Sequence, residues 1–136
     1  MKSLRSWFLG LSLITPLLAG CGSAPDVDAH RNAVGQFGTL RFEIDADKPL
    51  SQGSNDLRIS IHDATADEPF TGAAVDLSAI MPAMAHDAPN AATDEVGDGT
   101  YLARDVSLSM PGRWEIHVQA SRSDATDEVR FVYDIP

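Results

Sequence analysis

Three methionines and one histidine in the second half of the chain carry the side chains best suited to binding a soft metal ion. Met81, Met84 and His86 fall within six residues, and Met110 follows further along the chain. A thioether sulfur is a soft ligand, so methionine combined with imidazole suits Cu(I) better than zinc or magnesium. The sequence therefore predicts one candidate metal site, for Cu(I), made of Met81, Met84, His86 and Met110.

The same residues also have a purely structural interpretation. Methionine commonly fills irregular gaps in a core, and Met81 and Met110 each end an apolar run. His86 would then lie on a solvated loop. A third interpretation makes the loop from Met81 to His86 a docking surface for a protein partner without metal. The sequence leaves all three open, and it does not say whether Met110 lies near Met81 and Met84.

The other charged and imidazole side chains give weaker signals. His62 and His117 fall on the polar faces of two apparent strands. If those strands are neighbours in one sheet, the two rings could bind Cu(II) or another divalent ion; otherwise they are isolated surface residues. We interpret the acidic clusters at apparent turns as solvated; their members are Asp94, Glu95, Asp98, Asp124, Asp127 and Glu128.

Composition and motifs exclude several functions. With 20 acidic against 10 basic residues, the formal net charge is −10, so nucleic acid is not an expected partner. The sequence contains no nucleophile elbow, phosphate-binding glycine loop or zinc-protease motif. We therefore expect no catalytic residues, no enzymatic activity and no cofactor other than Cu(I).

The N-terminal segment is expected to be an export signal rather than part of the fold. Lys2 and Arg5 precede an apolar stretch over residues 7–19, which is too short to span a bilayer of about 30 Å. The sequence then reads Leu-Ala-Gly-Cys up to Cys21, which resembles the bacterial lipoprotein signal, whose cysteine is acylated after cleavage. An ordinary secretory signal with an incidental cysteine is the alternative.

This interpretation divides the chain into three parts. Residues 1–20 are the cleaved signal peptide, residues 21–38 a lipid-anchored flexible tether rich in small and polar residues, and residues 39–136 the folded domain. Cys21 is the lipid attachment site and the only cysteine, so the exported chain would have no free thiol. Gly22 in place of aspartate favours the outer membrane over the inner membrane.

Residues 39–136 alternate between polar and apolar side chains, which is typical of strands with one buried face. Turn signals separate the runs, and a change of parity near Arg104 and Asp105 suggests a bulge or a bend. Pro82 should end any regular strand there. We expect an all-β fold, a small antiparallel immunoglobulin-like β-sandwich of about seven strands. The clearest runs are 40–45, 57–62, 75–79, 106–110, 114–119 and 129–135.

Three motifs occur in a recognisable order. A Met-Pro-x-Met-x-His segment spans residues 81–86, a Gly-x-Tyr strand ends at Tyr101, and a Met-x-Gly-x-Trp hairpin entry spans residues 110–114. The combination resembles the YtkA-like family, which is related to FixH-like proteins, over residues 38–136. The resemblance implies an exported or membrane-tethered β-sandwich of a kind found beside copper handling, metal efflux and respiratory oxidase assembly.

The sequence thus predicts a lipid-anchored accessory module that faces the periplasm. Its partners would be the membrane, through the lipid on Cys21, and an envelope protein of an efflux or oxidase assembly. It would capture Cu(I) with the Met/His loop and hand it to a membrane complex. The alternative is a metal-free interaction module that assists an envelope, respiratory or efflux complex.

Overall fold

The computed structural model describes residues 28–136. The expected signal peptide and Cys21 lie outside the described residues. Within the described part, no helix is long and apolar enough to cross a membrane.

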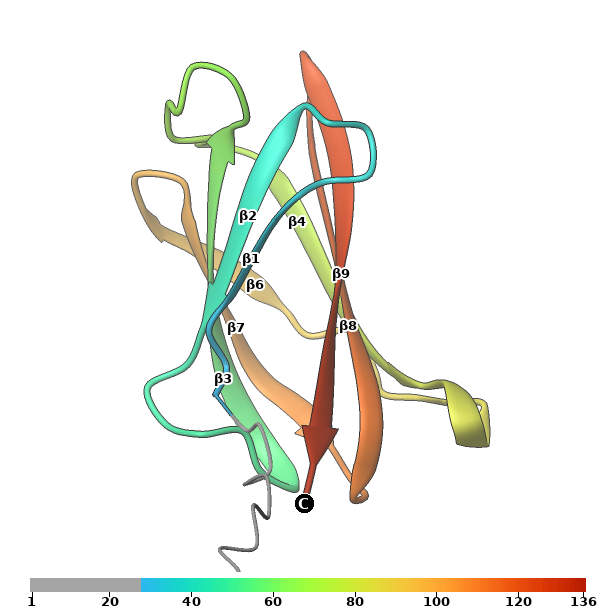
Figure 1. Ribbon diagram of the computed structural model, residues 1–136. Helices are drawn as coiled ribbons and strands as arrows, with labels where there is room; N and C mark the ends of the chain where they lie inside the picture. The colour runs from blue at the N-terminus through green and yellow to red at the C-terminus, as the bar shows by residue number, and fades with distance from the viewer. Residues whose placement is uncertain (1–27) are drawn as a thin grey trace, which may run out of the picture.

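Two antiparallel sheets pack face to face (Figure 1). The first sheet has the strand order β1-β2-β3-β7-β6, and the second has the order β5-β4-β8-β9. A single 3-10 turn, η1, follows β4. In chain order the elements are β1 Arg31–Val34, β2 Leu40–Asp45, β3 Gly53–Asp63, β4 Ala74–Met81, η1 Pro82–Met84, β5 His86–Asp87, β6 Thr93–Gly97, β7 Thr100–Leu108, β8 Gly112–Arg122 and β9 Ala125–Ile135.

The core lies between the sheets and consists of the inward-facing residue of each alternating pair. Its largest fully buried side chains include Trp114, Tyr101, Tyr133 and Phe42. The predicted all-β sandwich is confirmed. Five of the six predicted runs lie within strands, and the sixth, 106–110, extends two residues past the end of β7 at Leu108. The three strands that the pattern did not show are β1, β5 and β6. They are short, and most of β6 is exposed, so they carry no alternation to detect.

The predicted irregularity near Arg104 and Asp105 is also confirmed. Asn55 pairs with Val106 and Leu57 pairs with Ala103, so two residues of β7 face one residue of β3. Asp105 has a φ of 57°, which is a backbone conformation that aspartate tolerates better than most residues. Because the bulge adds one residue to β7, Ala103 and Val106 both face the core although they are three positions apart.

The boundary expected at residue 39 is too late. Strand β1 pairs with β2, with Arg31 opposite Ile44 and Val34 opposite Arg41, and Ala29 is already buried. Residues 29–34 thus belong to the sandwich rather than to a flexible tether. The sequence pattern did not show these residues, because the only side chains that the segment buries are small alanines. Burial of these alanines is favourable only once the rest of the sandwich is present.

Asp127 is not a solvated turn residue as the sequence suggested. Its carboxylate is fully buried and accepts backbone N–H bonds from Phe37 at 2.8 Å, Thr39 at 2.9 Å and Leu40 at 3.0 Å. A Cβ on Gly35 would lie 2.3 Å from its Cγ, so only glycine fits there. Burial raises the pKa of Asp127, but these hydrogen bonds outweigh burial and hold its pKa below the ordinary value.

Candidate functional site

The three candidate methionines come together at one end of the sandwich, which we call the methionine end. It is formed by the last residue of β4, the η1 turn, and the turn that leads from β7 into β8. Strands β4 and β8 pair as far as Ile80 opposite Glu115, so β4 ends beside the start of β8. The question that the sequence left open is therefore answered, since Met110 lies at the same end as Met81.

Met81 belongs to the core. Only 4% of it is exposed, and its Cε lies 2.8 Å from the position that a Cβ on Gly112 would take. Gly112 has a φ of 128°, so the backbone conformation calls for glycine there. A Cβ would also have to displace the Met81 methyl group, which is the flexible end of that side chain. The environment of Met81 agrees with the interpretation of this residue as a core filler.

Met84 has the opposite environment. Strand β4 stops before Pro82, which has no backbone N–H to continue the ladder, and η1 carries the chain outward. Ala85 then reverses it with a φ of 47°. Met84 is 64% exposed, so it fills no gap in the core. An exposed thioether on a projecting turn is available to a metal ion or to a partner (Figure 1).

His86 follows this turn in the chain, and Met110 lies in the turn that leads into β8. The chain returns after η1 as the short strand β5, which places the backbone of His86 opposite Met81. Met110 packs partly against the core, and its carbonyl oxygen accepts a hydrogen bond of 2.9 Å from the Trp114 indole N–H. Because Trp114 is fully buried, this bond ties the turn before β8 to the core.

The shared site suggested for His62 and His117 is wrong. His62 lies on β3 in the first sheet and His117 lies on β8 in the second sheet. Both face outward, so the core separates them. Each has a local acidic neighbour instead: His62 Nδ1 lies 3.8 Å from Asp67 Oδ1, and His117 Nε2 lies 3.2 Å from Glu115 Oε2.

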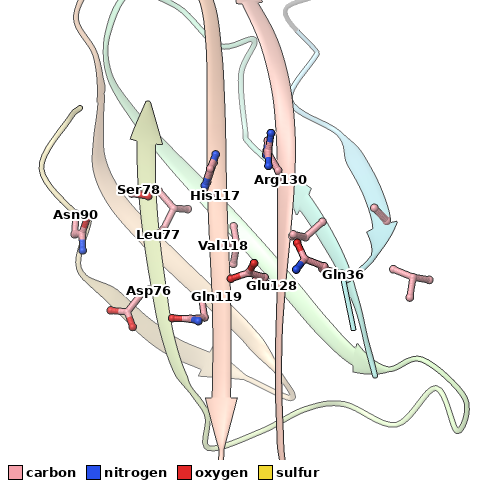
Figure 2. A pocket seen from close by; sticks show the side chains of 13 residues that line it. Gln36, Asp76, Leu77, Ser78, Asn90, His117, Val118, Gln119, Glu128 and Arg130 are labelled. Carbon is pink, nitrogen blue, oxygen red and sulfur yellow. The ribbon is translucent and has the colours of Figure 1, made fainter. Parts of the chain in front are cut away.

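The outer face of the second sheet holds a shallow polar hollow of about 640 Å³ that the sequence analysis did not identify (Figure 2). Strand parity places these residues outward, but only the pairing of β4, β8 and β9 makes them neighbours. Two cross-strand rows line the hollow, one of Ser78, His117 and Arg130 and one of Asp76, Gln119 and Glu128.

The hollow offers mixed charge rather than a metal cage. Glu115 lies beside the row of Ser78, His117 and Arg130. Its Oε2 is 3.2 Å from His117 Nε2 and 3.5 Å from Arg130 Nη1. Across residues 28–136, no group of three or more histidine, cysteine, aspartate or glutamate side chains is placed to hold a metal ion. The methionine end remains the better candidate for a soft ion, for which thioethers count as ligands.

These features define a class of protein: a two-sheet antiparallel β-sandwich with thioether side chains gathered at one end. A family model described as YtkA-like matches residues 36–119. This match covers more than half of the chain and includes all three motifs noted in the sequence. The chain therefore belongs to the YtkA-like family, as the resemblance predicted.

Solved structures of FetP from uropathogenic Escherichia coli strain F11 have a similar fold. For FetP as isolated after expression in the periplasm, the TM-score is 0.55 at 7% sequence identity, over 79% of this chain and 93% of FetP. For a copper-bound variant of FetP, the TM-score is 0.56 at 7% identity, over 79% of this chain and 95% of FetP. At this identity the likeness shows the fold alone. No curated protein matches the chain.

Proposed function

We propose that this chain is a lipid-anchored, non-enzymatic module of the bacterial envelope that binds Cu(I) at the methionine end and passes it to a membrane complex. It would face the periplasm from the outer membrane. The observation that carries the proposal is that Met81, Met84 and Met110 lie at one end of the sandwich, although Met110 comes from a different part of the chain than the other two. Thioethers bind Cu(I) and do not form disulfides, which suits an oxidising compartment.

The methionines have unequal roles in this proposal. Met84 is the first ligand, because most of its side chain is in contact with solvent. His86 follows η1 in the chain, and Met110 lies in the turn between β7 and β8 at the same end of the sandwich. Both are further candidate ligands. Met81 is buried, so it joins the ion only if its thioether turns outward, and otherwise it supports the site from below. The copper-bound FetP variant supports the idea that this fold is compatible with copper.

A competition assay tests the proposal directly. The purified chain is titrated against a coloured Cu(I) chelator, and we expect it to remove copper from the chelator with one-to-one stoichiometry. Met84→Leu removes the sulfur but conserves volume, and it should weaken binding by at least about tenfold, or about 1.4 kcal/mol. Val96→Ala is the matched control, because Val96 is an exposed apolar residue on β6. A wild-type chain that does not compete would refute copper binding.

The exposed methionine also favours a second function, a metal-free docking module. Methionine side chains adapt well to partner surfaces, and Met84 stands on a projecting turn. Leucine keeps the apolar contact but not the sulfur, whereas aspartate removes both. Capture of an envelope partner that survives Met84→Leu and copper chelation but is lost in Met84→Asp would favour docking. Loss of capture in both variants and on chelation would favour copper.

A further inference from the structure

The chain enters the sandwich at the methionine end. The carbonyl oxygen of Ala29 accepts a hydrogen bond of 2.7 Å from the Tyr133 hydroxyl. Tyr133 pairs with Trp114 near the start of β8, which is the strand that borders the methionine end. The Arg31 guanidinium lies 4.9 Å from the centre of the Tyr133 ring. These contacts hold the first described residues beside the end that carries Met81 and Met110.

The opposite end of the sandwich lies far from this entry point. Strand β1 runs away from the methionine end and turns into β2 beside Asp127, at the start of β9. The β8–β9 turn, with Ser123 at its tip, is at that distal end. Figure 1 shows the C-terminus and η1 toward the bottom and the β8–β9 turn at the top. Strand β9 has 11 residues, so the two ends are about 35 Å apart.

Early entry into the fold leaves little chain between the sandwich and Cys21. Residues 22–28 are the seven positions between Cys21 and Ala29, and they span at most about 25 Å even when fully extended. A tether that continued to residue 38 would span about 60 Å. The shorter limit keeps the entry point of the sandwich near any membrane into which a lipid on Cys21 is inserted.

We infer that the methionine end faces the membrane that holds the anchor, and that its partner is a protein embedded in that same membrane. Such a partner would present soft Cu(I) ligands, thiolate, thioether or imidazole, on its periplasmic face within about 25 Å of the bilayer. A short tether raises the effective concentration of the methionine end at that surface. This inference rests on the lipid anchor of the proposed function.

Energy transfer to the bilayer tests the orientation. The lipidated chain has no free thiol, so Ala83→Cys and Ser123→Cys each introduce one labelling site on an exposed residue, at the methionine end and the distal end respectively. Each labelled protein is placed in phosphatidylcholine vesicles that contain acceptor-labelled lipid headgroups. We expect transfer from position 83 to exceed transfer from position 123 several-fold. Equal transfer from both, or greater transfer from position 123, would overturn the inference.

A longer tether provides the control. Insertion of a flexible Gly/Ser segment of about 20 residues after Gly22 lengthens the reach and should bring the two transfer efficiencies together. The mass of each purified protein is measured first. A chain without lipid would overturn the anchor itself, whereas a lipidated chain with the wrong orientation would overturn only the present inference. Copper binding is measured separately by chelator competition and depends on neither result.

Discussion

The methyl carbon of Met81 lies against the backbone of Gly112, 2.8 Å from the point where a Cβ would stand. This contact connects the end of β4 to the start of β8, and a side chain at position 112 would have to displace the Met81 methyl group. The methionine end thus holds the thioether of Met81 in the core, whereas Met84 is exposed on η1.

Gly112→Ala should lower the free energy of unfolding by about 1–3 kcal/mol, because the new methyl group meets Met81 and the φ is unfavourable for alanine. Urea denaturation measures the change. Gly53→Ala is the matched control, since Gly53 also has a positive φ, 107°, but nothing lies within 4 Å of its missing Cβ. Equal losses in the two variants would show that only backbone conformation matters and that the Met81 contact does not.

Met81 and Met84 should respond very differently to truncation. Met81→Ala removes a buried side chain and should cost about 2–5 kcal/mol, whereas Met84→Ala should change stability by less than about 0.5 kcal/mol. Thermal and urea unfolding of both variants measure the difference. A large loss of stability in Met84→Ala would contradict its exposed position on η1.

Asp127 should make the fold sensitive to acid. Its pKa in the folded state lies below the ordinary value of 3.8, so its contribution to stability is full above the unfolded-state pKa and is lost as the pH falls through the folded-state pKa. Asp127→Ala leaves buried N–H groups without an acceptor and should cost more than about 2 kcal/mol at neutral pH. We expect urea unfolding at pH 7 and near pH 3 to differ less in Asp127→Asn than in wild type.

Asp98→Asn is the control for this experiment, because Asp98 is exposed at the β6–β7 turn and has a φ of 43° that asparagine also tolerates. It should keep the wild-type stability at pH 7 and the wild-type loss on acidification. If Asp127→Asn lost as much stability on acidification as wild type, Asp127 would not be the group that titrates.

The Tyr133 hydroxyl should protect the first strand. Tyr133→Phe removes its hydrogen bond to Ala29 and should cost about 1 kcal/mol, with faster amide hydrogen exchange over residues 31–34. Tyr101→Phe is the matched control, since the Tyr101 hydroxyl donates to the Phe70 carbonyl oxygen at 2.8 Å and so holds the β3–β4 connection instead. It should leave exchange in β1 unchanged. Equal exchange rates in β1 for wild type and Tyr133→Phe would refute the role of this bond.

Replacement of the single cysteine tests the lipid anchor of the proposed function. Cys21→Ser should abolish the mass increment of the acyl chains and move the protein from the membrane fraction to the soluble fraction, because no other thiol is available. Mass measurement and detergent partitioning report the result. A Cys21→Ser chain that stays in the membrane fraction with unchanged mass would refute acylation at this residue.

Features that depend only on neighbouring residues could be predicted from the amino-acid sequence. Alternation predicted all the strands except β1, β5 and β6, and Pro82 predicted the end of β4. The change of parity at Arg104 and Asp105 predicted an irregularity, which is a bulge. The three motifs predicted the YtkA-like family. These signals are local, because the side-chain period of a strand and the geometry of proline do not depend on distant parts of the chain.

Which distant residues come into contact depends on the tertiary structure. Parity placed His62 and His117 outward, but strand pairing put them on opposite faces of the sandwich. In the sequence Asp127 resembles the solvated acidic residues around it. In the fold, the turn over residues 35–40 covers its carboxylate. In the same way, the burial of Met81 and the exposure of Met84 depend on how β4 packs beside β8. These outcomes depend on pairing between segments that are far apart in the sequence. A local residue pattern does not reveal the free energy of that pairing.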